Sequence, residues 1–336
     1  MTYIKRIFQI QILYLVSILP WFIDPSDACT RIFHVNNQTA LVARNMDWLE
    51  HIPAQFRIYP RGIEHSGKVI HGQALKWISK YGSMVVTSYE DAIVSEGINE
   101  AGLSVHLLSL SESDYGQRQS NVPGVSLSMW AQYYLDQFGS VTQAVKATSH
   151  PEYQLEILYL PHLNKHVKLH MALEDAQGHS AIIEYIQGKP IIYTNNIALT
   201  NDPPYDVQLK NLQQYTGFGG DKPLPGTNNS KDRFVRASWY NKHLPIANST
   251  EEAVLSLFIV IRNVAKPYVS GTERTRWHVI ADLTHKVYYY ASTSSLNIVK
   301  ISLDQFDLSE NAATMMLDIE KHPELSGDIS NQFEPL

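Results

Sequence analysis

The chain has 336 residues, of which 44% are hydrophobic and 18% charged, and its formal net charge is −6. This composition excludes disordered and fibrous proteins, and without a long lysine or arginine run nucleic acid is not expected as a partner. A chain of this length buries about three quarters of its unfolded surface, so it needs no disulfide or structural metal to fold. Its single cysteine, Cys29, has no second cysteine in the chain with which to form a disulfide.

The N-terminal segment has the pattern of a secretory signal peptide. Two basic residues precede an apolar stretch over 7–23, and small residues stand one and three places before Cys29. We therefore predict that residues 1–28 are removed by cleavage after Ala28, so that the protein is secreted or periplasmic. An uncleaved membrane anchor is the alternative, but the apolar stretch is short for a membrane span.

The first predicted element of the mature chain is a β-hairpin that carries reactive side chains. An Asn-Asn pair at 36–37 lies between β-forming residues and predicts a two-residue turn, because asparagine tolerates positive φ. In that register Cys29 faces Arg44 on one face of the pair, with Asp47 three residues beyond. A longer loop would shift this register.

These three side chains suggest nucleophilic catalysis. If Cys29 is N-terminal, its α-amine, with an ordinary pKa of about 7.7–8.0, can remove the proton of its own thiol. Arg44 would favour the thiolate by its charge, and Asp47 can orient the amine by hydrogen bonding. The alternatives are a small buried cysteine and a solvated Arg–Asp ion pair.

The rest of the chain alternates hairpins with helices and contains no linker that would divide it, so residues 29–336 are expected to form one domain. In chain order, the predicted elements are a helix over 127–138, a hairpin of 167–173 with 180–185, a helix from Thr250 to before Pro267, and a hairpin of 277–281 with 286–292. This order predicts stacked antiparallel sheets with helices outside.

Several motifs make the chain resemble the choloylglycine hydrolases, a family that includes bile salt hydrolases and penicillin V acylases. They are Cys29-Thr30, the run from Arg44 to Asp47, the segments over 96–103 and 199–203, and 224–226 followed by 232–234. The resemblance implies an N-terminal-nucleophile amidase with an α+β fold, a four-layer αββα sandwich of two antiparallel sheets. Such an enzyme cleaves linear C–N amide bonds of small molecules with an apolar acyl group. Family members often form tetramers, and the oligomeric state of this chain stays open.

The resemblance also implies a role for each matching polar residue. Cys29 would be the nucleophile, with Arg44 beside its sulfur and Asp47 holding its amine. Asn201 would donate its side-chain amide to the oxyanion, and Arg233 would complete the polar network. From residue type alone, Asn201 would be a turn residue and Arg233 a surface helix residue.

Two further positions are expected at the site. Many family members carry asparagine or tyrosine after the segment that ends at residue 103, where this chain has Ser109. A backbone N–H of Ser109 would serve as the second oxyanion donor, whereas its side chain is too short to copy an amide. Trp48 is expected to form a wall of the acyl pocket, and core packing is its alternative role.

The segments over 81–83, 232–238 and 275–277 resemble the penicillin V acylases of Gram-negative bacteria. That branch implies activity on penicillin V and N-acyl homoserine lactones, with bile salt hydrolysis as the alternative. A lipid-anchored binding protein acylated at Cys29 is the alternative of another class, although Ser26 stands where a lipobox has leucine.

No cofactor is expected, because the fourteen histidines show no metal-ligand spacing and no dinucleotide or P-loop motif occurs. His34 and His106 lie in predicted strands and are expected to be packing or surface residues.

Overall fold

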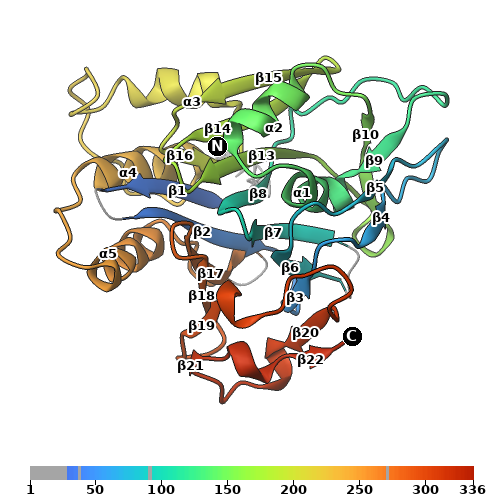
Figure 1. Cartoon of the computed structure of the whole chain (residues 1–336). Helices are drawn as coiled ribbons and strands as arrows, with labels where there is room; N and C mark the ends of the chain where they lie inside the picture. The colour runs from blue at the N-terminus through green and yellow to red at the C-terminus, as the bar shows by residue number, and fades with distance from the viewer. Residues whose placement is uncertain (1–28, 37–38, 90–92, 270–271) are drawn as a thin grey trace, which may run out of the picture.

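The computed structural model describes residues 29–36, 39–89, 93–269 and 272–336. The predicted signal peptide lies outside the described residues. Among the helices of the described ranges, none is both long enough and apolar enough to cross a membrane. Two large β-sheets occupy the centre of the molecule (Figure 1).

The first sheet has seven strands, and the segment that follows Ala28 lies within it. Its order is β16 (Ala198–Thr200), β1 (Thr30–Val35), β2 (Ala40–Trp48), β17 (Arg274–Asp282), β18 (Val287–Ser292), β19 (Val299–Ser302) and β21 (Gly327–Asp328). All neighbours in this sheet are antiparallel except β19 and β21, which are parallel. The strand that follows Cys29 is therefore an interior strand, held on both sides.

The second sheet has nine antiparallel strands. Its order is β15 (Lys189–Thr194), β14 (Ser180–Ile186), β13 (Leu169–Asp175), β8 (Leu103–Ser109), β7 (Ile93–Asn99), β6 (Ser83–Ser88), β3 (Gln55–Tyr59), β20 (Met315–Asp318) and β22 (Glu334–Pro335). Three short pairs lie outside the two sheets: β4 (Glu64–Ser66) with β5 (Lys76–Ile78), β9 (Gly124–Ser126) with β10 (Gln154–Glu156), and β11 (Leu158–Leu160) with β12 (Lys165–Val167).

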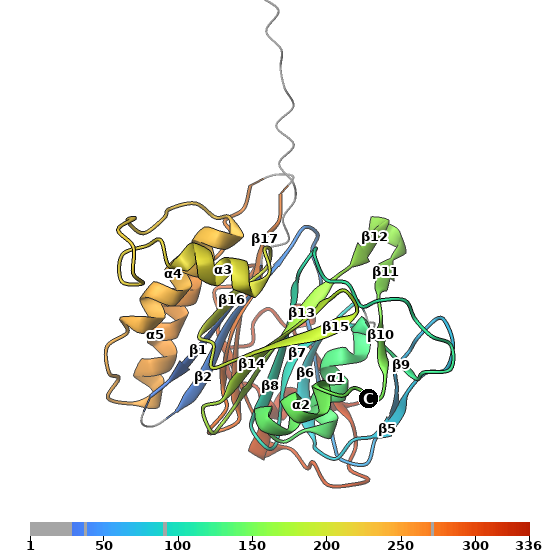
Figure 2. The same cartoon turned by 90° about the horizontal axis from the view of Figure 1, so that it is seen from above.

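Helices cover the outer face of each sheet. On the seven-stranded sheet lie α4 (Ser230–Lys242) and α5 (Thr250–Asn263), with α3 (Tyr205–Leu212) against α4; on the nine-stranded sheet lie α1 (Leu127–Gln137) and α2 (Val141–Thr148). Short 3₁₀ turns occur at Pro161–Leu163, Leu303–Gln305, Ile319–Lys321 and Ser330–Gln332. Figure 2 shows the resulting layers in the order helix, sheet, sheet, helix. This arrangement confirms the predicted αββα sandwich.

The elements predicted from periodicity are present at nearly the predicted bounds. The two predicted helices are α1 and α5, and each begins with a serine that caps it: Ser126 accepts a hydrogen bond from Ser128 N, and Ser249 from Glu252 N. The two predicted hairpins are β13–β14 and β17–β18. These elements were predictable because helix caps, the spacing of apolar residues and turn residues are all local features of the sequence.

The predicted register of the first hairpin is wrong by two residues. Arg44 pairs with Arg31 instead of Cys29, and Val35 pairs with Ala40. The cause is a longer connection, because Asn36 N donates to Thr39 O at 3.0 Å and Thr39 N donates to Asn36 Oδ1 at 2.8 Å. Since side chains alternate with a period of two, this shift leaves the cysteine and Arg44 on the same face.

The motif over 96–103 builds the turn between β7 and β8. The Asn99 side chain donates to Leu135 O and Phe138 O, each at 2.8 Å, and accepts from Leu103 N at 3.0 Å. Gly102 has φ of +83°, and a Cβ there would lie 2.6 Å from the carbonyl oxygen of Leu283. This turn ties α1 to the nine-stranded sheet.

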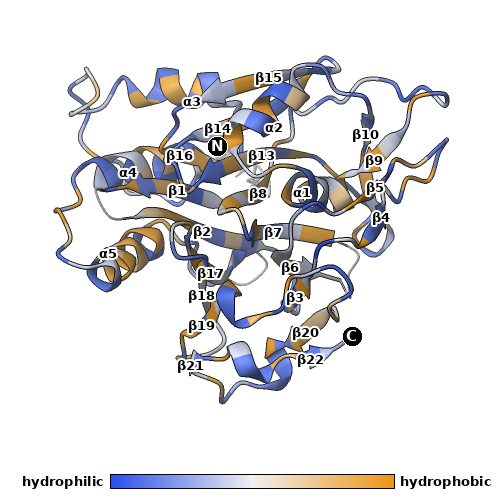
Figure 3. Ribbon diagram, viewed as in Figure 1, coloured by the Kyte–Doolittle hydropathy of each residue, from blue (hydrophilic) through white to orange (hydrophobic). Residues whose placement is uncertain are grey.

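Charged groups lie in the layer between the sheets as well as apolar ones. Figure 3 shows hydrophilic residues among the hydrophobic ones in central strands such as β1 and β7. Glu96 of β7, His106 of β8 and Glu174 of β13 are each completely buried. Buried carboxylates need partners, and the facing sheet supplies Arg44 for Glu96 and Arg31 for Glu174.

Candidate active site

Strand pairing brings residues from distant parts of the chain to Cys29. Thr30 pairs with Thr200, so Cys29 and Asn201 leave the same end of the seven-stranded sheet on neighbouring strands. Arg233 reaches this end from α4, which packs on β1 and β16. The sheet register thus explains why a residue 172 positions away along the chain lies beside Cys29.

Asn201 holds the main-chain nitrogen of Cys29. The nitrogen donates to Oδ1 of the Asn201 side chain, which is completely buried. The Nδ2 group of the same amide finds no hydrogen-bond partner anywhere in the described ranges. A buried amide donor without a partner is available to a ligand atom at this point.

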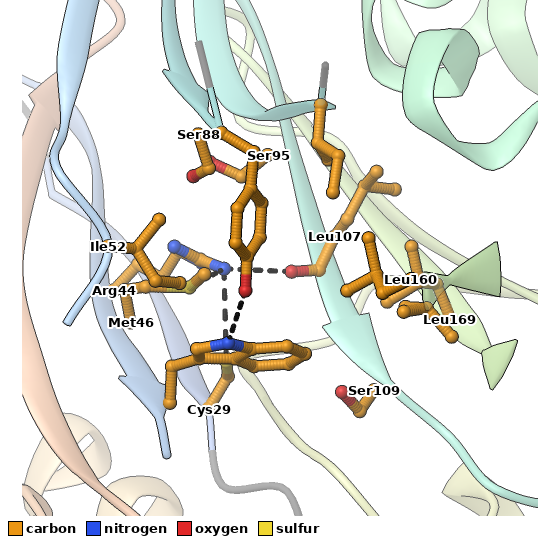
Figure 4. Close-up of a pocket in the computed structure, with 14 residues that line it drawn as sticks. Cys29, Arg44, Met46, Ile52, Ser88, Ser95, Leu107, Ser109, Leu160 and Leu169 are labelled. Carbon is orange, nitrogen blue, oxygen red and sulfur yellow. Dashed lines mark hydrogen bonds between the residues drawn. The ribbon is translucent and has the colours of Figure 1, made fainter. Parts of the chain in front are cut away.

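Arg44 lies next to the sulfur. Its Nη2 is 3.8 Å from Cys29 Sγ and donates to Leu107 O at 2.9 Å (Figure 4). Its Nη1 donates to Glu96 at 2.6 Å. The guanidinium is thus held from the nine-stranded sheet. It presents a fixed positive charge to the cysteine.

Asp47 and Arg233 lie on the helix side of the sheet. Arg233 Nη1 donates to Cys29 O at 2.7 Å and stands 3.8 Å from Asp47 Oδ2. Thr275 Oγ1 donates to Asp47 Oδ1. The predicted hydrogen bond from the Cys29 nitrogen to Asp47 is not found between the described residues, and Asp47 Oδ2 accepts none from them.

Burial raises the pKa of two groups at the site, the Cys29 thiol and the Asp47 carboxyl. It raises the pKa of the Cys29 thiol to about 12, although the Arg44 charge opposes the shift. It also raises the pKa of Asp47 to about 6, against the lowering effect of Arg233. The cysteine is therefore a thiol at neutral pH in this structure, and an attack by its sulfur needs a base.

A chain of buried polar side chains connects the two sheets behind Arg44. Glu96 Oε2 lies 3.3 Å from His106 Nδ1, and His106 Nε2 lies 3.5 Å from Glu174, which pairs with Arg31 Nε at 2.9 Å. Burial opposes ionisation of Glu96, but Arg44 and His106 outweigh it and lower its pKa to about 2. His106 is fully buried in β8, in line with the expected packing role, and it also contacts two buried carboxylates.

The sulfur lies at one end of an apolar pocket with about 480 Å³ of empty space. The pocket is lined by Cys29, Arg44, Met46, Trp48, Ile52, Ser88, Tyr89, Ile93, Ser95, Leu107, Ser109, Leu160, Val167 and Leu169. Trp48 and Ser109, both expected at the site, are among these residues. The apolar lining suits a small molecule with a hydrophobic part.

Ser109 can offer its backbone N–H to the pocket. Leu110 N donates to Lys168 O at 3.0 Å, so the alternating antiparallel ladder directs the Ser109 N–H away from β13. Its cross-strand neighbour Leu169 donates its own N–H to Tyr115 Oη at 2.8 Å. The β7–β8 pairing on the other side ends at His106.

A polar rim fixes the indole of Trp48. Its Nε1 donates to Tyr89 Oη at 2.8 Å, and that hydroxyl donates to Glu50. Glu50 also contacts His162 Nε2 at 2.9 Å, and Lys165 Nζ lies 5.1 Å from the centre of the Trp48 ring. Trp48 is 7% exposed and lines the pocket beside Cys29.

Comparison with known proteins identifies the class to which this fold and site belong. Residues 29–318 match the family described as linear amide C–N hydrolases, choloylglycine hydrolase family. The chain belongs to this family, and it is a hydrolase of linear C–N amide bonds in small molecules. The predicted family is confirmed.

Within the family, the chain is similar to penicillin V acylases. It is 33% identical to the penicillin V acylase of Pectobacterium atrosepticum over 92% of this chain and 90% of the relative. The structure of the penicillin V acylase from Agrobacterium tumefaciens superposes with a TM-score of 0.82 at 35% identity and covers 92% of this chain and 98% of that one. A bile salt hydrolase/transferase of Clostridium perfringens is 24% identical over 67% of this chain and 75% of the relative.

The sequence assigned no role to Glu96, the partner of Arg44, or to Thr275, the partner of Asp47. Glu96 lies inside a recognised motif, yet its contact with Arg44 follows only from the packing of two sheets. Thr275 reaches Asp47 from 228 positions away along the chain. One signal was available for Glu96, since a buried arginine beside the nucleophile requires a nearby carboxylate.

Proposed function

We propose that residues 29–336 act as one domain, a cysteine amidase in which Cys29, freed by removal of residues 1–28, is the N-terminal nucleophile. The observation that carries the proposal is the position of Cys29. Its sulfur faces an apolar pocket beside Arg44, while its nitrogen is bound by Asn201.

In the proposed reaction the α-amine removes the thiol proton, and the sulfur attacks the carbonyl carbon of the amide. The raised thiol pKa makes this base necessary, and Arg44 stabilises the thiolate as it forms. The α-ammonium then returns the proton to the leaving nitrogen, and the C–N bond breaks to leave a thioester on Cys29. Water, deprotonated by the α-amine, hydrolyses the thioester and releases the acid.

The oxyanion of each tetrahedral intermediate needs hydrogen-bond donors. The unpartnered Nδ2 of Asn201 and the backbone N–H of Ser109 fit this role. Asp47 Oδ2 accepts no hydrogen bond from the described residues, and a mature α-amine has more N–H donors than the peptide nitrogen described above. Asp47 and Arg233 would thus position the amine and the backbone of Cys29.

We place the mature enzyme outside the cytoplasm, secreted or periplasmic, on the strength of the signal-peptide pattern. The competing proposal, a binding protein lipid-anchored at Cys29, requires acyl chains on a residue that is only 4% exposed and lines the pocket. Intact-mass measurement of protein from the native cell envelope separates the two. Acyl chains on residue 29 would exclude the amidase mechanism, because the nucleophile and its base would be blocked.

An uncut N-terminus is expected to remove nearly all activity. A variant with cleavage blocked, or with an untrimmed Met before Cys29, has a peptide bond in place of the α-amine and therefore lacks the base. The measurement is turnover of penicillin V by the extended chain before and after proteolytic exposure of Cys29. Full turnover by the extended chain would show that the α-amine is not the base.

Penicillin V and medium-chain or long-chain N-acyl homoserine lactones are the proposed substrates. We base this on the pocket lining and on the greater identity to penicillin V acylases than to bile salt hydrolases. In a parallel assay of the mature protein with penicillin V, N-decanoyl homoserine lactone and glycocholate, we expect glycocholate to have the lowest kcat/KM. The highest kcat/KM for glycocholate would instead favour a bile salt hydrolase.

A further inference from the structure

One polar group in the apolar pocket has no role in the reaction described above. Ser88 ends β6, is 2% exposed and lines the pocket, and its Oγ has no hydrogen-bond partner among the described residues. Ser88 and Ser95 lie at the opposite end of the pocket from Cys29 and Ser109 (Figure 4). The hydroxyl therefore lies away from the reacting sulfur.

The neighbouring serine differs in one respect. Ser95 Oγ donates to Val86 O at 3.1 Å, so its hydroxyl is satisfied by the protein. Ser95 is also the extra residue of a β-bulge, because Val86 pairs with Glu96 while Thr87 pairs with Val94. Bulges next to active sites re-aim side chains, and this one interrupts the β6–β7 ladder beside Ser88.

A buried hydroxyl without a partner destabilises the state in which it occurs, and a ligand oxygen that bonds to it removes that penalty. Most of the other residues that line the pocket, Ile52 and Ile93 among them, are apolar. An all-carbon acyl group would leave the Ser88 hydroxyl unpartnered in the complex. An acyl group with a distal oxygen would satisfy it.

We propose that Ser88 forms a polar subsite at the far end of the acyl pocket, and that among aryloxyacetyl and fatty-acyl amides the preferred substrates carry a hydroxyl or carbonyl oxygen at the distal end of the acyl group. This inference rests on the proposed function, since it assigns the pocket to the acyl group. Ser88 sets specificity by hydrogen bonding to the substrate, and it takes no part in the bond-breaking steps.

The test compares amides that differ only at the distal position. Two matched pairs share one chromogenic leaving amine: phenoxyacetyl with (4-hydroxyphenoxy)acetyl, and decanoyl with 10-hydroxydecanoyl. We expect the kcat/KM ratio of hydroxylated to plain amide to fall on the order of tenfold in Ser88→Ala for at least one pair. Ser95→Ala is the matched control, and we expect it to retain the wild-type ratio in both pairs.

If Ser88→Ala does not fold, Ser88→Thr and Ser88→Val form a second comparison, because they have the same shape and only threonine keeps the hydroxyl. Wild-type ratios in Ser88→Ala, or equal ratios in the Thr and Val variants, would overturn the subsite. Failure of the wild type to cleave any of the four amides would count against the proposed function instead. In that case calorimetric binding of the four free acids still tests the Ser88 subsite. The subsite predicts that Ser88→Ala weakens binding of the hydroxylated acids and leaves binding of the plain acids unchanged.

Discussion

Replacing Cys29 with serine is expected to lower kcat by about a thousandfold or more, while substrate still binds. The reason is the buried position of the side chain, since burial already raises the pKa of the Cys29 thiol to about 12. A hydroxyl is far harder to deprotonate than a thiol, so the same α-amine activates it much less effectively. The measurement is steady-state turnover of penicillin V together with equilibrium binding of the same substrate.

The control for this variant is a measurement that shows it folds correctly. Serine occupies nearly the same volume as cysteine, so the circular dichroism and thermal unfolding of Cys29→Ser should match the wild type. A correctly folded Cys29→Ser protein with the wild-type kcat would contradict the assignment of Cys29 as nucleophile. Loss of binding together with turnover would instead show that the substitution disturbs the pocket.

Removing the Asn201 amide is expected to lower kcat by about 100- to 1,000-fold, the usual effect of losing one oxyanion donor. Asn201→Asp is the sharper variant, because the aspartate keeps an oxygen acceptor for the Cys29 nitrogen and loses the Nδ2 donor. We expect Asn201→Asp to be impaired as strongly as Asn201→Ala. The measurement is kcat and KM for penicillin V in both variants.

The matched control is Asn248→Asp, the same chemical change at an exposed position before α5. It should retain wild-type kcat and KM. If Asn201→Asp retained wild-type kcat, the amide nitrogen would have no role in the oxyanion hole. Asn201 would then serve only to hold the Cys29 nitrogen.

The sequence was informative about the site wherever the pattern was local. The hairpin after residue 28 placed Cys29 and Arg44 on one face although its register was wrong by two residues, because an even shift preserves the face. The segment that ends in Asn201 could be recognised as a motif. Its position beside Cys29 came from the pairing of β16 with β1.

Contacts between the two sheets could not be predicted in this way. Glu96 of β7 and Glu174 of β13 lie in the nine-stranded sheet, and their partners Arg44 and Arg31 lie in the facing sheet, so no turn or spacing in the chain indicates either contact. Ser88 is a second example, because the missing partner of its hydroxyl is a property of the folded pocket. Such features depend on tertiary packing, which local propensity does not encode.

The central claim, that Cys29 is an N-terminal nucleophile, is tested most directly by trapping the acyl-enzyme. Mature protein is mixed with penicillin V, quenched in acid during turnover and digested, and the mass of the peptide that begins at Cys29 is measured. We predict that this peptide begins with a free Cys29 in resting enzyme and carries one phenoxyacetyl group during turnover. An acyl group found on a peptide without Cys29, or turnover by protein in which Ala28 is still attached, would contradict the claim.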